Sequence, residues 1–185
     1  MSASDKKSDD PNSELSSPST LTKRDLADMR ERYNFPDRLR VKVGGQSADR
    51  IIPGYVCAYR VFFEECGLRF PIPRLIIQFC DRLGLQFAQM CPNFVRQVMA
   101  MLLLSREVGI FLDVNDLGRL LIAKRNSKHH LMCNLANRPR QGINTDLPCK
   151  EKNWGSKYFY FKISDKTVEV VKNCLSVQWK TDCGN

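Results

Sequence analysis

The sequence has no long hydrophobic run. Its longest one, residues 98–104, is bounded by Arg96 and Arg106, whereas a helix that spans a bilayer needs roughly 20 apolar residues. Residues 1–20 contain no apolar stretch like that of a signal peptide. We therefore expect a protein that is not secreted, does not bind a membrane, and lies inside the cell, in the nucleus or the cytoplasm.

The common signatures of catalysis and nucleotide binding are also absent. The sequence contains no Gly-x-Ser-x-Gly, no His-Glu-x-x-His and no glycine-rich phosphate loop. Asp25, Asp113 and Asp116 stand where helices are expected to begin, so they are assigned to capping and not to a divalent metal site. We predict a protein that is not an enzyme, with no cofactor and no small-molecule substrate.

Eight cysteines are present, but no Cys-x-x-Cys pair. A disulfide framework is typical of short secreted chains, so we expect reduced thiols in this one. The single cluster of histidine and cysteine consists of His129, His130, Cys133 and Cys149. It lacks a second ligand pair at a spacing known from zinc modules, and we predict no metal site.

Charge is unevenly distributed along the chain. Residues 1–21 are rich in Ser, Asp, Lys and Pro and poor in apolar side chains, which predicts a disordered tail. Residues 22–185 are expected to form a single globular domain, and they hold 27 basic against 16 acidic residues. This excess of positive charge favours an anionic partner.

Apolar periodicity, caps and helix breakers predict about five helices. They cover residues 23–33, 55–66, 74–83, 94–108 and 114 to about 125. In the helix at 74–83 the polar residues Arg74, Gln78, Asp81 and Arg82 share one face, which is expected to be solvated. The helix at 94–108 is apolar nearly all round, which is the pattern of a central helix.

The last third of the chain has the character of strands. Residues 129–134 and 157–164 are expected to form a small antiparallel sheet, and 39–43 a short strand; residues 167–179 fit either a closing helix or a third strand. At least two of the four aromatic residues at 158–161 should be in the core, since alternate side chains face opposite sides. The expected fold class is α+β, predominantly α, with a bundle of about five helices to about residue 125, followed by a small antiparallel β-sheet with its strands within 129–164.

The best candidate for a functional site is a stretch that holds six basic residues and no acidic one between positions 119 and 141. We call it the basic stripe; it consists of Arg119, Lys124, Arg125, Lys128, Arg138 and Arg140. Clustered positive charge is what phosphate binding requires, so the stripe predicts contact with DNA or RNA. The competing interpretation is structural, because cations at a helix end interact favourably with its dipole.

Several short segments share their order with a known family. The chain resembles the gypsy-type transposon (transposase-like) domain of plant transposon-derived proteins over roughly residues 21–163. The matching segments are Pro53-Gly54-Tyr55, residues 67–73, residues 83–85, Pro92-Asn93, residues 105–109, Leu147-Pro148, Trp154 and residues 158–161. The resemblance implies an origin in a plant transposable element, and it supplies no catalytic residue.

Two hypotheses of function follow. The first is a nonenzymatic, transposon-derived domain that contacts nucleic acid through the basic stripe. The alternative is a gag-like module of protein–protein assembly that associates with itself or with other proteins through an exposed helix face. A continuous positive surface would favour the first hypothesis and an exposed apolar patch the second.

Overall fold

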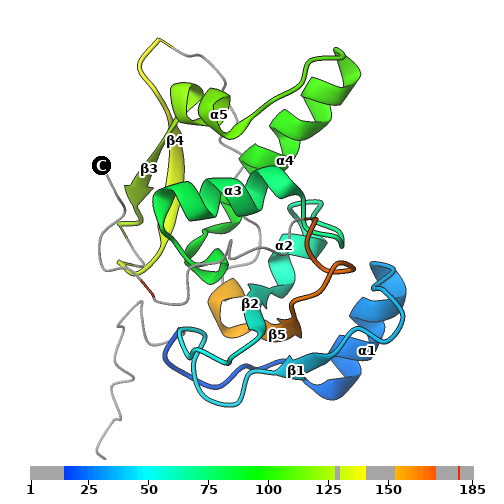
Figure 1. The fold of residues 1–185 in the computed structure, drawn as a ribbon. Coiled ribbons are helices and arrows are strands. Elements are labelled where there is room, and N and C mark those ends of the chain that lie inside the picture. The colour runs from blue at the N-terminus through cyan, green and yellow to red at the C-terminus, as the bar shows by residue number, and fades with distance from the viewer. Residues whose placement is uncertain (1–14, 128–129, 141–152, 170–178, 180–185) are drawn as a thin grey trace, which may run out of the picture.

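The computed structural model describes residues 15–127, 130–140, 153–169 and 179. Figure 1 labels the α-helices and strands within these residues, and two short 3-10 helices complete the order of elements along the chain. They are α1 (Lys23–Arg32), β1 (Val41–Val43), β2 (Tyr55–Tyr59), α2 (Arg60–Glu64), α3 (Arg74–Leu83), the 3-10 helix η1 (Phe87–Gln89), α4 (Pro92–Glu107), α5 (Val114–Leu120), β3 (Leu121–Arg125), β4 (Cys133–Asn137), the 3-10 helix η2 (Trp154–Ser156) and β5 (Tyr158–Lys162).

The strands form two antiparallel sheets. In the first sheet the order is β1-β5-β2, so the C-terminal strand β5 lies between two strands from the first third of the chain. Tyr59 is opposite Tyr158 in its register, and Val43 is opposite Phe159. The second sheet is the pair β3-β4, in which Leu121 is opposite Asn137.

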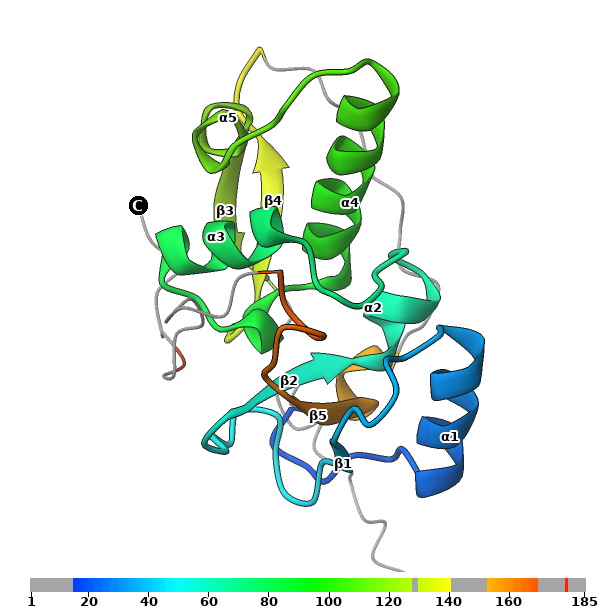
Figure 2. The ribbon, with the colours of Figure 1, turned by 45° about the vertical axis from the view of Figure 1, so that its right-hand side comes forward.

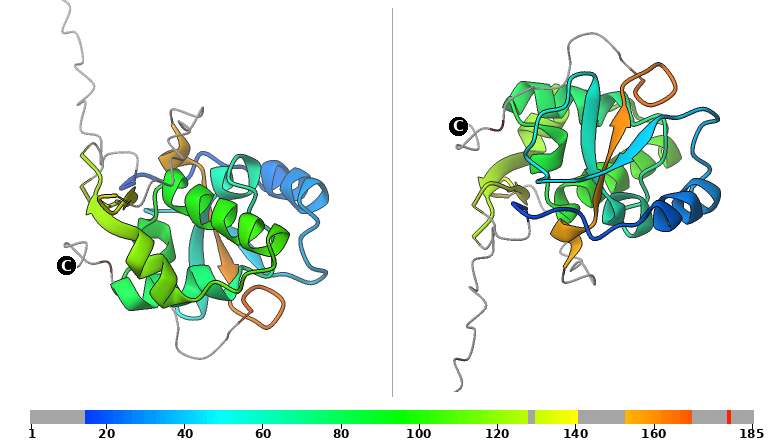
Figure 3. Two further views of the ribbon diagram at one scale, coloured as in Figure 1. Left: turned by 90° about the horizontal axis from the view of Figure 1, so that it is seen from above. Right: turned by 90° about the horizontal axis from the view of Figure 1, so that it is seen from below.

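The two sheets lie at opposite ends of the molecule, with helices between them. The three-stranded sheet and α1 form one end, and α5 with β3 and β4 forms the other (Figure 2). Helix α3 contacts both α4 and α5, and Figure 3 shows α3 and α4 on the same side of the three-stranded sheet. A single hydrophobic core runs through both ends.

Strand β5 is central to this core. Its first four residues, all aromatic, are buried, because β1 and β2 pair with its two edges and other parts of the chain cover both faces. Phe159 packs against Phe35 and Phe63 with ring centroids 6.0 and 5.8 Å apart. The aromatic run is therefore a core strand, and it offers no surface for stacking bases.

The expected fold class is wrong. The chain is not a helical bundle followed by one sheet but a mixed fold of helices with two antiparallel sheets. The expected helix at 55–66 is strand β2 followed by the short helix α2. Periodicity alone cannot separate a helix from a strand in a short apolar run. Residues 55–59 form a strand because they pair with β5.

A second correction concerns the region of the basic stripe. The helix expected from 114 to about 125 ends at Leu120, and residues 121–125 are strand β3. Its partner β4 covers 133–137 and not 129–134. The helices expected at 23–33, 74–83 and 94–108 are present as α1, α3 and α4, because caps or helix breakers stand at their ends.

The packed chain begins earlier than expected. Leu15 and Leu21 are both buried in the core, and the backbone N–H of Ser19 donates to the Gly44 carbonyl at 2.9 Å. Of the tail expected at 1–21, residues 1–14 lie outside the described part, as do 170–178 of the C-terminal segment. Within that segment Val168 forms a parallel bridge with Ile72.

The cysteines differ in their state. Cys57, Cys66, Cys80 and Cys91 are free and buried, and burial raises the pKa of the Cys57 and Cys80 thiols. Cys133 is disulfide-bonded, so the expectation of reduced thiols is wrong at this position. Among the described helices, none is both long and apolar enough to cross a membrane.

Candidate nucleic-acid interface

The structure divides the basic stripe between the two ends of the β3-β4 pair. Lys124 and Arg125 are exposed at the end of β3, whereas Arg119 is exposed in the last turn of α5. Arg138 and Arg140 are exposed just after β4, and Lys128 lies outside the described residues. The antiparallel register places residue 138 beside α5, and a five-residue strand of about 13 Å separates it from Arg125.

The larger group surrounds the end of helix α5. The Arg138 Nε donates a hydrogen bond to the Gly118 carbonyl at 2.8 Å, and its backbone N–H donates to the Leu120 carbonyl at 2.9 Å. Two bonds from one residue thus fix the chain after β4 to the last turn of the helix. Among the described residues, this contact engages one of the five N–H donors of the guanidinium.

A further arginine, which the sequence did not single out, reaches the same helix from α3. The Arg82 Nη1 donates to the Asn115 Oδ1 at 2.6 Å. The Arg82 guanidinium carbon lies 3.3 Å from the point that a Cβ on Gly118 would occupy. Because Gly118 has no side chain, the Arg82 guanidinium can lie close to the backbone of α5. We call Arg82, Arg119 and Arg138 the α5 arginines.

Two of the α5 arginines are held by neutral oxygens. Within the described residues, Arg82 and Arg138 form no ion pair, and their side chains donate to an amide oxygen and a carbonyl oxygen, respectively. Arg119 pairs with Asp116 at 3.5 Å on the exposed surface, where such pairs stabilise little. By contrast, Arg60 is paired with Glu64 at 2.8 Å. The charges around α5 are thus positioned but largely not neutralised.

The acidic residues of α5 are engaged in its capping box. The Asp113 carboxylate accepts the backbone N–H groups of Asn115 and Asp116 at 2.7 and 2.9 Å, and Asp116 accepts the N–H of Asp113 at 3.1 Å. The hydrogen bond from the Asp116 backbone is the main cause that lowers the pKa of Asp113. These carboxylates serve the start of the helix. Arg119 and Arg138 lie at its last turn, whereas Arg82 reaches along its side from Asn115 to Gly118.

The histidine and cysteine cluster is not assembled as a site in the described residues. His130 is exposed, Cys133 is buried and disulfide-bonded, and His129 and Cys149 lie outside the described part. Across the described ranges, no three His, Cys, Asp or Glu side chains form a group that could hold a metal ion.

Two proteins of Arabidopsis thaliana are similar to this chain. Meiosis-specific protein ASY2 is 33% identical over 121 residues, which are 63% of this chain and 8% of that protein. An uncharacterized protein named chloroplastic is 25% identical over 164 residues, which are 87% of this chain and 20% of that protein. The chain thus spans at most a fifth of the length of these relatives. No family model and no solved structure matches it, so the resemblance to the transposon domain stays a prediction.

Proposed function

We propose that this chain is a nonenzymatic module that contacts the phosphate backbone of DNA or RNA through the α5 arginines. The observation that carries the proposal is that α3, α5 and the segment after β4 bring three arginines to one short helix. Two of their guanidinium groups are oriented by neutral oxygens. Arginine suits this role because its planar fork of donors matches the geometry of phosphate.

Lys124 and Arg125 extend the proposed surface along β3. Phosphates repeat at intervals of several ångströms along a nucleic-acid strand, so basic groups at both ends of a strand pair can contact one backbone. The buried aromatic run leaves no stacking platform on β5. Binding through phosphates alone depends only weakly on base sequence.

The relatives support a role inside the cell. One of them is named meiosis-specific, and meiosis acts on chromosomal DNA, which fits a nuclear location better than a cytoplasmic one. The other is named chloroplastic, and chloroplasts also contain nucleic acid. We also propose that the chain originates from a plant transposable element. This origin is supported by the segments between Pro53 and Phe161 that resemble the transposon domain.

The test replaces two of the α5 arginines with a neutral residue. The double variant Arg82→Gln/Arg138→Gln should bind random-sequence DNA and RNA at least about tenfold more weakly than the original chain at low salt, or about 1.4 kcal/mol. The matched control, Arg24→Gln/Arg32→Gln, removes the same charge from exposed positions of α1. It should bind nearly as well as the original chain.

Equal losses in both double variants would show that net charge alone drives binding and would contradict a site at α5. Circular dichroism of each variant distinguishes weaker binding from unfolding, because Arg138 also tethers the last turn of α5.

A further inference from the structure

The end of helix α4 carries an exposed apolar surface. Among the described residues six large hydrophobic side chains are exposed, and five of them lie within nine positions. We call these five the α4 tip: Leu103, Leu104, Val108, Ile110 and Phe111. Single exposed apolar residues are ordinary. At about 100° per residue, Leu103 and Leu104 lie on a different side of α4 from its recess-lining residues, and of the tip residues Ile110 and Phe111 line the recess described below. The tip projects from the body of the molecule (Figure 1), so the expectation of a central helix is wrong for this end of α4.

The α4 tip is held in a defined conformation. The N–H of Ile110 donates to the Ser105 carbonyl at 2.8 Å and that of Gly109 to the Arg106 carbonyl at 3.3 Å. Gly109 has φ of 68°. This is the Schellman arrangement, in which a left-handed glycine ends a helix. Because the tip is already ordered, a partner that binds it loses little conformational entropy.

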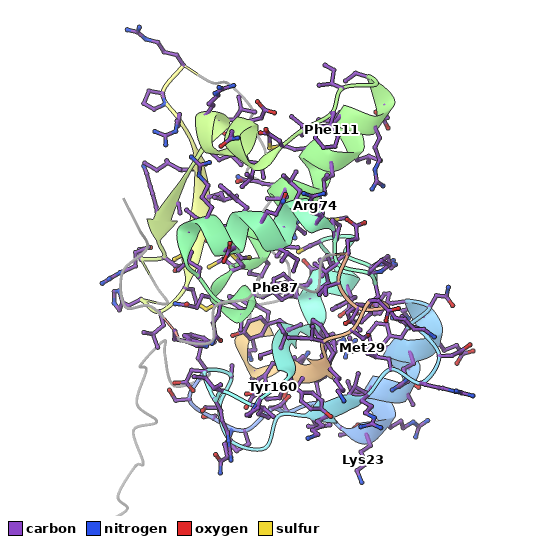
Figure 4. The ribbon with its side chains drawn as sticks, in the orientation of Figure 1. Lys23, Met29, Arg74, Phe87, Phe111 and Tyr160 are labelled. Atoms are coloured by element: carbon purple, nitrogen blue, oxygen red, sulfur yellow. The ribbon has the colours of Figure 1, made fainter. Side chains whose placement is uncertain are left out.

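A recess lies directly beside the tip. It has a volume of about 470 Å³, and its apolar lining includes Leu75, Leu102, Leu112 and Val114. Phe111 lies at its edge with 88% of its surface exposed, and Figure 4 shows it on the segment between α4 and α5. An apolar cavity of about 150 Å³ is enough for benzene, so the recess can take a phenyl ring.

The rim of the recess carries both signs of charge. Arg74 and Arg106 are basic, and Asp113 and Glu169 are acidic; the Glu169 carboxylate accepts the backbone N–H of Arg74 at 2.6 Å. A surface that combines a projecting ring, a recess and opposite charges complements itself. In a two-fold dimer each patch meets its own copy, so a basic rim group can face an acidic one.

We propose that the α4 tip is a homodimer interface, in which Phe111 of each copy enters the recess of the second copy. Ile110 and Phe111, the two tip residues that line the recess, offer less than the roughly 800 Å² that each partner buries in a standard interface. The recess and its rim add to this area. The dimer is therefore weak, with a dissociation constant in the micromolar range of about 1–100 μM. It does not depend on the proposed contact with nucleic acid.

Analytical ultracentrifugation of the whole chain, from about 1 to 200 μM, tests this interface. We expect a reversible monomer–dimer equilibrium, which Phe111→Asp abolishes. The matched control is Ile51→Asp, since Ile51 is the sixth exposed hydrophobic residue and lies outside the tip; this variant should dimerise like the original chain. A chain that stays monomeric throughout, or equal effects of both substitutions, would overturn the proposal.

Mixing two variants tests the pairing of ring and recess. Val114→Lys blocks the recess but keeps Phe111, whereas Phe111→Asp keeps the recess. Each variant alone should be monomeric. Their mixture should form a heterodimer, because one ring still finds an open recess and the introduced Asp and Lys face each other. A mixture that stays monomeric while both variants keep the circular dichroism of the original chain would contradict this geometry.

Discussion

Two buried tyrosines differ in how their hydroxyl groups are satisfied. The Tyr160 hydroxyl donates to the carbonyls of Ser47 and Arg50, at 2.7 and 3.1 Å. The Tyr59 hydroxyl is buried with no hydrogen-bond partner among the described residues. Tyr160→Phe should therefore lower the free energy of unfolding by about 1–2 kcal/mol, whereas Tyr59→Phe should leave it unchanged or raise it by up to about 1 kcal/mol. Urea denaturation measures both, and a larger loss in Tyr59→Phe would contradict the assignment.

Neighbouring glycines provide a second comparison at the residue scale. A Cβ on Gly44 would lie 1.9 Å from a ring carbon of Tyr158, whereas one on Gly45 would meet nothing within 4 Å. Gly44→Ala should lower the free energy of unfolding by about 1–3 kcal/mol, because the buried ring has to move. Gly45→Ala should change it by less than about 0.5 kcal/mol. The melting temperatures of the two variants measure this difference. Equal melting temperatures would show that Tyr158 is not fixed against this turn.

At the scale of elements, the capping box of α5 makes stability depend on pH. Hydrogen bonds to the charged carboxylate lower the pKa of Asp113 below its ordinary 3.8. This contribution is fully present above that value and is lost as the pH falls through the lower pKa of the folded state. Asp113→Asn keeps an oxygen that can cap the helix but does not titrate. The stability advantage of Asp113 over Asn should thus be largest at neutral pH and shrink below pH of about 4.

Urea denaturation of both proteins between neutral pH and pH of about 3 measures this difference. A difference that stays constant with pH would mean that the charge on Asp113 does not contribute to the cap.

The sequence predicts those elements whose ends carry local signals. Pro73 and Gly84 bound α3, and Thr22 caps α1 through its hydrogen bond with Asp25, so both helices could be placed closely. Strands β2 and β3 have no such boundary, since each adjoins a helix without a break. Their conformation is set by pairing with β5 and β4, which lie far away or across a loop in sequence. Non-local pairing of this kind overrides local propensity.

The candidate site could be predicted only in part for the same reason. The basic stripe could be predicted because its residues are close in sequence. Their distribution between the two ends of the β3-β4 pair could not, because it depends on the antiparallel register. Arg82 is 37 positions before Arg119 in the chain and reaches α5 only because α3 packs against it. The sole local sign was Gly118, a glycine within a helix, which often marks a close approach of another group.

At the scale of the whole molecule, the end opposite to α1 brings together two surfaces of different character. The α5 arginines and β3 give it positive charge, and the α4 tip gives it exposed apolar area. The first surface attracts anions at long range, and its effect declines with salt. The second acts mainly by burial of apolar area, which salt screening does not weaken, and salt screens only its charged rim. Salt therefore separates the two proposed activities experimentally.

The most direct test of the central claim is the salt dependence of nucleic-acid binding. With random-sequence duplex DNA, the logarithm of the association constant should fall linearly with the logarithm of the salt concentration, with a slope of about −0.9 for each phosphate contact. Arg82→Gln/Arg138→Gln should make this slope shallower by about two units, while dimerisation in the absence of DNA stays as in the original chain. Absence of binding at low salt, or a slope that the double variant leaves unchanged, would contradict phosphate contact through the α5 arginines.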